Sequence, residues 1–185
     1  ENTVNQLYLK KINLSNIKKV SCGYEFTFFL DYSGNLYASG RNVYGVFGIG
    51  FTLYDYISKP VLVNTGVEKV DCGSRHVVII KNSKLYSCGY NNFGQLGLGN
   101  TDNTDVFSEI TLIDTYGATI VDVKCSNTFS SFFIDNYGYV YSCGLGNNMI
   151  LGHGNSNSYT VPLWIENLEN IITISVDYNH VVALD

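Results

Sequence analysis

The chain has 185 residues, a formal net charge of −5, 45% apolar residues and 15% charged residues. This balance is typical of a folded globular chain and excludes a disordered one. No apolar run approaches the ~20 residues of a membrane-spanning helix. Only 11 residues are basic, and two of them, Arg41 and Arg75, are arginines. We therefore expect no membrane segment and no direct nucleic-acid binding, which needs a broad basic surface.

Runs of β-branched and aromatic residues that alternate with polar ones predict strands along the whole chain. In chain order the predicted strands are Leu7–Leu14, Ile17–Cys22, Phe26–Leu30, Asn35–Ser39, Val61–Asn64, Glu68–Cys72, His76–Ile80, Lys84–Cys88, Val106–Leu112, Ile120–Cys125, Phe129–Ile134, Tyr139–Cys143, Val161–Glu166, Ile171–Val176 and His180–Leu184. Residues that tolerate a left-handed backbone predict hairpin turns at Asp31–Gly34, Lys81–Ser83 and Asp135–Gly138. No segment has the apolar stripe of an α-helix, so the chain is predicted to be all-β.

Three short signatures recur along the chain in a fixed order. The first stands at Val20–Gly23 (VSCG), Val70–Gly73 (VDCG), Val123–Ser126 (VKCS) and Ile174–Asp177 (ISVD), with starts 50, 53 and 51 residues apart. The second stands at Leu36–Gly40, Leu85–Gly89 and Val140–Gly144, and the glycine-rich third at Tyr44–Gly50, Phe93–Gly99 and Met149–Gly154. A period near fifty residues, with four short strands in each period, predicts a β-propeller.

We expect one partial β-propeller domain over residues 1–185, built from four-stranded antiparallel blades. The repeat units span about 1–50, 51–99, 100–154 and 155–185, and the last lacks a strand, which gives about three and three-quarter blades. Neighbouring blades share their core, so an incomplete ring leaves an apolar face and strand edges uncovered. Three explanations stay open: a fragment of a larger propeller, which we favour, self-association through the uncovered terminal blade, or a closed ring of four blades.

The five cysteines follow the repeat. One position holds Cys22, Cys72 and Cys125, and another holds Cys88 and Cys143. Equivalent positions of successive blades lie on different sheets, beyond the ~7 Å Cα separation that a disulfide spans. We therefore predict reduced, buried thiols that serve the scaffold. Reduced thiols indicate an intracellular location, either cytoplasmic or nuclear.

Other recurring residues are also assigned to the scaffold. The glycines of Gly94–Gly99 precede a loop and a strand, whereas a phosphate-binding loop must open a helix. His76 and His180 share one repeat position without metal ligands at suitable spacing, so we expect them to bond to a neighbouring backbone carbonyl. Asp31 and Asp135 recur in the hairpin turns. We expect no metal site, no cofactor and no catalytic residues.

The signatures at Val70–His76, Leu85–Gly89 and Asn91–Gly99 resemble the regulator-of-chromosome-condensation repeat. Three copies in the right order and at the right period make the resemblance specific, and it covers the chain from about Ile17 to Asp185. It implies a β-propeller that commonly has seven blades, so this chain would be a fragment of one. The histidine of the repeat is replaced by Phe26 in the first unit and by Phe129 in the third.

The segments that do not repeat are the better functional candidates. The connections Arg41–Ser58, Tyr90–Asp105 and Leu145–Thr160 differ in sequence and should emerge on one face of the propeller. Tyrosine and arginine are favoured at interface hot spots. The candidate partner-binding residues are Arg41, Tyr44, Tyr54, Tyr56, Asn91, Phe93, Asn147, His153 and Tyr159. Tyr54 and Tyr56 do not recur and are the best candidates, whereas Tyr44 and Phe93 share a repeat position and could instead tuck under their loops. His153 is expected to be exposed.

These observations predict a non-catalytic scaffold that binds a protein partner through its variable loops. The resemblance implies an alternative, because the best-known member of the family is a guanine-nucleotide exchange factor for the small GTPase Ran. A Ran-like GTPase is therefore the alternative partner. An enzyme with its own chemistry is the least favoured hypothesis, since no Ser/His/Asp order or nucleophile elbow is present.

Overall fold

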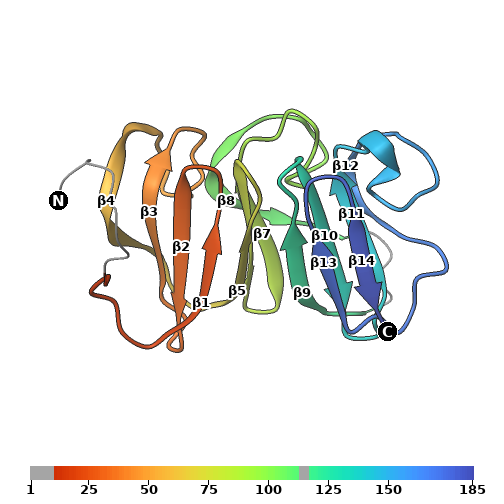
Figure 1. Ribbon diagram of the computed structural model, residues 1–185, viewed down its shortest axis with the longest axis horizontal. Helices are drawn as coiled ribbons and strands as arrows, with labels where there is room; N and C mark the ends of the chain where they lie inside the picture. The colour runs from red at the N-terminus through yellow and green to blue at the C-terminus, as the bar shows by residue number, and fades with distance from the viewer. Residues whose placement is uncertain (1–10, 113–116) are drawn as a thin grey trace.

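The computed structural model describes residues 11–112 and 117–185, and the side chains of residues 53–55 lie outside this description. Within these residues fourteen strands run through the chain (Figure 1). They are β1 (Ile17–Cys22), β2 (Phe26–Asp31), β3 (Leu36–Asn42), β4 (Leu53–Asn64), β5 (Val67–Cys72), β6 (His76–Lys81), β7 (Lys84–Gly89), β8 (Thr104–Ile110), β9 (Ile120–Cys125), β10 (Ser130–Asp135), β11 (Val140–Gly144), β12 (Tyr159–Trp164), β13 (Thr173–Val176) and β14 (Val181–Leu184). A short 3₁₀ turn, η1 (Asn147–Met149), lies between β11 and β12.

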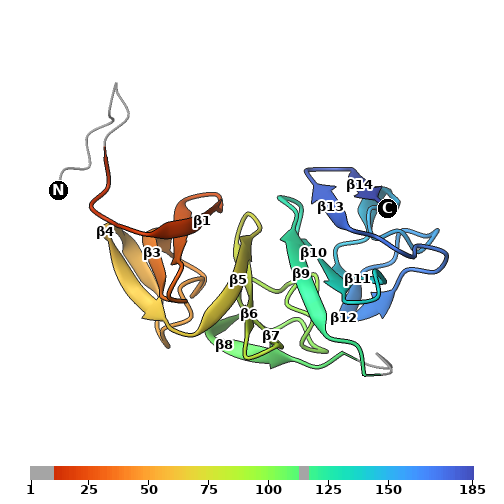
Figure 2. The ribbon, with the colours of Figure 1, turned by 90° about the horizontal axis from the view of Figure 1, so that it is seen from below.

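The strands form three four-stranded antiparallel sheets and one hairpin. The sheets have the orders β1-β2-β3-β4, β5-β6-β7-β8 and β9-β10-β11-β12, and β13 pairs with β14. Figure 2 shows them following one another along an arc, with the inner strands β1, β5 and β9 in sequence. Each sheet is one propeller blade. The prediction of an all-β chain of four-stranded blades is confirmed.

The blades differ in phase from the repeat units read in the sequence. The predicted strand Val61–Asn64 lies in β4, and β4 pairs with β3 of the preceding unit. In the same way β8 pairs with β7, and β12 pairs with β11. Each sheet therefore takes its fourth strand from the next predicted unit. Of the predicted first strand, residues 11–14 are not a strand and the remainder lies outside the described residues. β4 is also longer than predicted, so it takes up part of the connection Arg41–Ser58.

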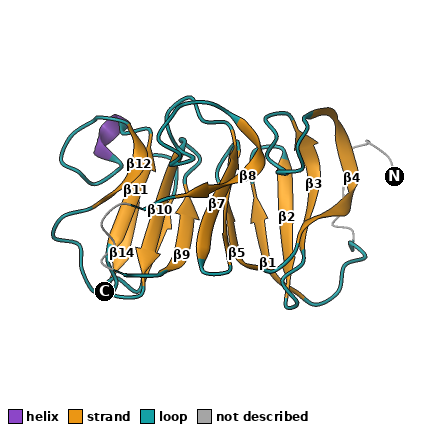
Figure 3. Cartoon of the chain, turned by 180° about the vertical axis from the view of Figure 1, so that it is seen from behind, coloured by secondary structure: helices purple, strands orange, loops and turns teal. Residues whose placement is uncertain are grey.

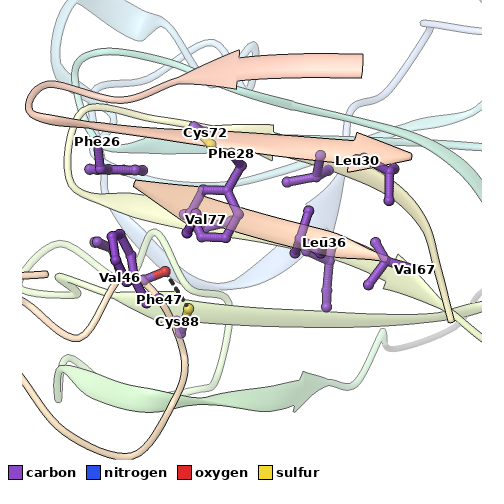
Figure 4. Close-up of a cluster of buried hydrophobic side chains, with 13 residues drawn as sticks. Phe26, Phe28, Leu30, Leu36, Val46, Phe47, Val67, Cys72, Val77 and Cys88 are labelled. Carbon is purple, nitrogen blue, oxygen red and sulfur yellow. Dashed lines mark hydrogen bonds between the residues drawn. The ribbon is translucent and has the colours of Figure 1, made fainter. Parts of the chain in front are cut away.

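The apolar core lies between neighbouring blades. Val70, Val123 and Ile174 occupy one position of the inner strands, and each is at most 3% exposed because it packs on the blade before it. Figure 4 shows Phe28 and Leu36 of the first blade beside Cys72 and Val77 of the second. The cores are thus shared between units, as in other repeat proteins.

The outer blade faces are open within the described residues. Val20 occupies the same inner-strand position as Val70 but is 50% exposed. At the other end, Val182 and Leu184 of β14 are 62% and 58% exposed, whereas Val78 and Ile80 at the matching positions of β6 are buried. The uncovered terminal face expected from the sequence is therefore present.

The recurring cysteines join blades without disulfides. All five are free thiols, and only Cys22, which has no described blade before it, is exposed. The Sγ of Cys72 donates to the carbonyl of Ser21 at 3.6 Å, and the Sγ of Cys88 donates to the carbonyl of Val46 at 3.2 Å (Figure 4). Burial raises the pKa of both thiols well above the usual value, so they stay protonated. The predicted scaffold role fits these contacts.

Ser21 and Asp71, the residues before Cys22 and Cys72, add a second contact between blades. The backbone N–H of Cys72 donates to Ser21 Oγ at 3.0 Å, and that of Cys125 donates to Asp71 Oδ2 at 2.9 Å. Ser21 and Asp71 occupy the same repeat position, and Ser21 Oγ also donates to Asp71 Oδ1 at 3.1 Å. These side chains satisfy backbone donors that the blades leave unpaired where they meet.

His76 also joins two blades, although not through the carbonyl that was expected. Its Nε2 lies 2.9 Å from Ser131 Oγ of the third blade, and that hydroxyl donates to the carbonyl of Gln95 at 2.7 Å. Because the hydroxyl proton is used on Gln95, Nε2 must donate. Burial lowers the pKa of His76, so the imidazole is neutral. The prediction that His76 bonds directly to a backbone carbonyl is therefore wrong, because Ser131 Oγ stands between the imidazole and the Gln95 carbonyl. His180, at the same repeat position, is exposed.

Candidate functional site

One end of the blades carries the variable segments. The β1–β2, β5–β6 and β9–β10 turns meet there with the long β3–β4, β7–β8 and β11–β12 connections, which Figure 3 shows gathered along one side of the molecule. We call this end the loop face. The opposite end carries the short hairpins between the second and third strands of each blade. The predicted emergence of the variable connections on one face agrees with this arrangement.

A backbone contact repeated in every four-stranded blade positions the residue before the second strand. The carbonyls of Glu25, Arg75 and Phe129 accept from the N–H of the residue after a glycine, at 2.8, 2.9 and 2.9 Å. In the second blade that glycine is Gly89, with φ +110°, and a Cβ there would lie 2.6 Å from the Arg75 carbonyl. Only glycine allows this close approach. Glu25, Arg75 and Phe129 therefore occupy equivalent places on the loop face.

The position of Phe129 differs from the one predicted. Ser130 pairs with Gly144 as His76 pairs with Gly89, so Ser130 holds the histidine position of the third blade. The third unit has one more residue between Cys125 and this strand than the second unit has between its cysteine and His76. This extra residue moves Phe129 onto the loop face.

Arg41 is held by an acidic partner and an aromatic ring. Its Nη1 donates to both carboxylate oxygens of Glu25, at 3.2 and 3.0 Å, and its guanidinium lies 5.5 Å from the Tyr56 ring centroid. The Tyr56 hydroxyl donates to the same carboxylate at 3.1 Å. The hydrogen bond to Glu25 raises the pKa of Arg41, so the charge is permanent. Tyr56 itself is 57% exposed.

Arg75 lies between two tyrosine rings. Its guanidinium carbon is 5.9 Å from the Tyr24 ring centroid and 5.3 Å from that of Tyr44, within cation–π range. Its Nη1 donates to the Tyr44 hydroxyl at 3.2 Å. Tyr24 is 72% exposed. The sequence interpretation missed Tyr24 and Arg75 because it searched only the long connections, although both residues differ between units.

A run of aromatic rings continues from Tyr44 to the third blade. Ring centroids lie 5.1 Å apart for Tyr44 and Tyr90, 5.3 Å for Tyr90 and Phe129, and 5.4 Å for Phe129 stacked on Phe93. Tyr44 and Phe93 are half-buried in this run. Their repeated position thus combines packing beneath the loop with partial exposure. Phe129 has φ +69°, an unfavourable region for a bulky residue, and its ring contacts hold it there.

A cavity of about 260 Å³ opens between the two arginines. We call it the loop-face hollow. It is lined by Tyr24, Glu25, Phe26, Arg41, Val43, Tyr44, Val46, Ser74 and Arg75. Ser74 Oγ is buried and has no hydrogen-bond partner in the part of the chain that the structure describes. The hollow therefore offers positive charge, and an unpaired hydroxyl is buried in its wall.

Asn91 does not belong to this surface. It is fully buried, and its Oδ1 accepts from the Leu96 N–H at 2.9 Å while its Nδ2 donates to the Asn100 and Asp102 carbonyls at 3.1 and 3.0 Å. Asn91 organises the β7–β8 connection, and the prediction that it contacts a partner is corrected. Asn42 has the same position in the first blade and accepts from its own loop, so the repeat already contained this signal.

The remaining predicted residues lie apart from the hollow. His153 is half-buried rather than exposed, because its Nε2 lies 2.9 Å from Ser142 Oγ and its ring centroid lies 5.0 Å from that of Tyr159. Burial lowers the pKa of His153. Asn147 is exposed at a second cavity, of about 240 Å³, that also touches Tyr178. The side chain of Tyr54 lies outside the described residues.

Among residues 11–112 and 117–185, no three His, Cys, Asp or Glu side chains group as metal ligands. In the same residues no helix is long and apolar enough to cross a membrane.

Comparisons with known proteins agree with the fold. Sequence models of the Regulator of chromosome condensation (RCC1) repeat match residues 33–80, 82–133 and 137–184, and a second model of the repeat matches 17–46 and 67–95. Serine/threonine-protein kinase Nek9 of Xenopus laevis is 34% identical over 161 residues, 84% of this chain and 16% of the kinase. Ultraviolet-B receptor UVR8 of Arabidopsis thaliana is 33% identical over 153 residues, 80% of this chain and 34% of the receptor. The chain thus spans about a third or less of these relatives.

Solved structures show the same architecture. Human WBSCR16 superimposes with a TM-score of 0.80 at 23% identity, over 94% of this chain and 48% of that one. Prp20p from Saccharomyces cerevisiae, studied for its binding properties to Gsp1p and histones, superimposes with a TM-score of 0.79 at 20% identity, over 92% and 44%. At these identities the likeness concerns the fold. The repeat matches extend over most of the sequence, and the chain belongs to the regulator of chromosome condensation (RCC1) repeat family.

Proposed function

We propose that this chain is a protein-interaction module whose loop face binds a partner protein. The observation that carries the proposal is the grouping of the chain's two arginines around one hollow, beside Tyr24, Tyr44 and Tyr56. These residues come from strands β3 and β4 and from turns of the first two blades, and their sequences differ between units. The scaffold residues hold the blades together, and the loop face carries the residues that vary.

The chemistry of this group is that of an interface hot spot. Tyrosine and arginine are enriched where truncation costs binding most, and aromatic rings lose little conformational freedom on binding. Arg41 and Arg75 are already oriented by ring contacts and hydrogen bonds. A partner would therefore meet a surface whose ordering cost is largely met in the free protein.

A pull-down with matched variants tests the proposal. We expect Tyr24→Ala/Tyr56→Ala to lose recovery of a partner, with about a 30-fold weaker Kd for each hot-spot ring. The control is Tyr32→Ala/Tyr137→Ala on the opposite hairpins, where the two rings are 76% and 59% exposed. Equal recovery of every partner by the two double variants would contradict the proposal.

Guanine-nucleotide exchange on a Ran-like GTPase is the second candidate. Its support is the likeness in fold to Prp20p, a protein with binding properties to Gsp1p. Exchange requires no acid–base residues, because a partner need only disorder the phosphate and magnesium site. The test is release of a fluorescent nucleotide from Ran with and without micromolar protein. No acceleration would remove this candidate and leave the interaction module standing.

Two further expectations remain proposals. Self-association through the terminal blade is supported by the exposure of Val182 and Leu184, and sedimentation at several concentrations tests it. An intracellular location, cytoplasmic or nuclear, is supported by the five free thiols, and imaging of the tagged protein tests it.

A further inference from the structure

We propose that Arg75 receives a carboxylate from an acidic segment of the partner protein, inside the loop-face hollow. This inference rests on the interaction function proposed above and names the chemistry of the partner. The occupant is a peptide segment rich in glutamate or aspartate, and its side-chain carboxylate pairs with the guanidinium edge of Arg75.

The geometry leaves the donors of Arg75 available. Within the described residues, its hydrogen bond runs to the Tyr44 hydroxyl, and no carboxylate lies within ion-pair distance. A guanidinium has five N–H donors in a planar fork that matches a carboxylate. The guanidinium carbon lies 5.9 Å from the Tyr24 ring centroid and 5.3 Å from that of Tyr44, so two rings hold Arg75 in the wall of the hollow while its remaining N–H donors stay available.

Arg41 provides the contrast within the same hollow. Its guanidinium is already paired with both carboxylate oxygens of Glu25. That pair, joined by the Tyr56 hydroxyl, also neutralises the one acidic group among the lining residues. Arg75 therefore supplies the uncompensated charge of the hollow, although the chain as a whole carries −5.

The hollow itself can accept a carboxylate. Its volume of about 260 Å³ exceeds by several times the share of a liquid water molecule, about 30 Å³. Ser74 precedes Arg75, lines the hollow, and has a buried hydroxyl without a partner in the described residues. An unsatisfied buried hydroxyl is unfavourable, and rotation of the Ser74 side chain toward the hollow would let a ligand oxygen beside Arg75 satisfy it.

Arginine side-chain NMR tests the assignment directly. The 185-residue chain contains two arginines, so ¹⁵N-arginine labelling gives two Nε–Hε signals, which Arg75→Lys and Arg41→Lys assign by deletion. Hexaglutamate is titrated at low salt, with hexaglutamine as the uncharged probe. We expect the Arg75 signal to shift and saturate with hexaglutamate while the Arg41 signal stays in place.

Matched variants separate a specific site from general attraction. In fluorescence anisotropy with labelled hexaglutamate, Arg75→Gln should weaken binding at least about 10-fold, as expected for a lost charge-assisted pair. Lys18→Gln removes the same charge from an exposed position on β1 and should change binding less than about twofold. Equal losses in the two variants, or a shift of both arginine signals together, would overturn the site.

A phosphoserine peptide forms the last arm. A response of Arg75 to phosphoserine with none to hexaglutamate would overturn the carboxylate assignment. The variants also distinguish failure of the acidic contact from failure of the proposed interaction function on which it rests. If Tyr24→Ala/Tyr56→Ala loses the partner while Arg75→Gln retains it, the loop face binds a partner and the acidic contact is refuted. If neither loses the partner, both are refuted.

Discussion

Replacement of His76 by phenylalanine should remove an acid sensitivity that His76 imposes on the fold. Complete burial lowers the pKa of His76 to about 3 from the usual 6.5. The folded protein therefore holds the imidazole neutral, whereas the unfolded chain protonates it below pH 6.5. The contribution of the neutral His76 imidazole to the free energy of unfolding is complete above pH 6.5 and is lost as the pH falls toward 3.

The first blade supplies the design of this variant. Phe26 stands where His76 stands in the second blade, and its ring packs over Gly23 as the imidazole packs over Gly73. Phenylalanine should therefore fit, and Ser131 keeps its bond to the Gln95 carbonyl. At pH 5, which is 1.5 units below the reference value, the neutral-histidine penalty amounts to about 2 kcal/mol.

Urea unfolding followed by circular dichroism between pH 7.5 and 4.5 measures this penalty. The free energy of unfolding of the parent chain should fall relative to His76→Phe by about 1.4 kcal/mol for each pH unit below 6.5. All other titratable groups are the same in the two proteins, so their contributions cancel in the difference. A difference between the two proteins that stays constant with pH would refute the buried, neutral state of His76.

Three other predictions concern the scaffold and the loop face. At pH 8 a thiol reagent should modify Cys22 quickly and the four buried cysteines only after unfolding, and the absorbance of the released group counts the modified thiols. Fast reaction of two or more cysteines in the folded protein would contradict the blade contacts. Phe129→Gly should be more stable to urea than Phe129→Ala by about 1 kcal/mol, because a positive φ is strained for alanine and not for glycine. Equal stability of the two variants would argue against a positive φ at this position. Asp71→Ala should lower the free energy of unfolding by about 1–3 kcal/mol by leaving the Cys125 N–H unpaired, and Asp71→Ser should recover part of it as Ser21 does in the first blade; a harmless Asp71→Ala would contradict the contact.

The repeat was enough to predict the blade but not which strands pair. Alternation and spacing locate strands, and the fifty-residue period indicates a propeller. Pairing is decided by long-range hydrogen bonds, so the grouping of β4 with β3 across the predicted unit boundary could not be read from local pattern. For the same reason the sequence could not identify Ser131, 55 residues away, as the partner of His76.

The sequence predicts that the variable connections share one face, but it misassigns particular residues of that face. The variable connections lie together at one end of the blades, as the sequence predicts, and Arg41, Tyr44 and Tyr56 gather there. The sequence pattern predicts a partner contact for Asn91, although Asn42 shares its repeat position, which indicates a loop-organising residue. The sequence pattern does not identify Arg75, because this residue lies in a tight turn between a glycine and a histidine that recur. Those recurring residues led the whole turn to be assigned to the scaffold.

Site-specific photocrosslinking tests the central claim most directly. Benzoylphenylalanine is placed at Tyr56 on the loop face and, in a second protein, at Tyr32 on the opposite hairpin, where both side chains are well exposed. Each protein is illuminated with a partner recovered in the pull-down, and the covalent adduct is quantified. A loop-face interaction module predicts an adduct from position 56 and none from position 32. An adduct from position 32 alone would contradict the account.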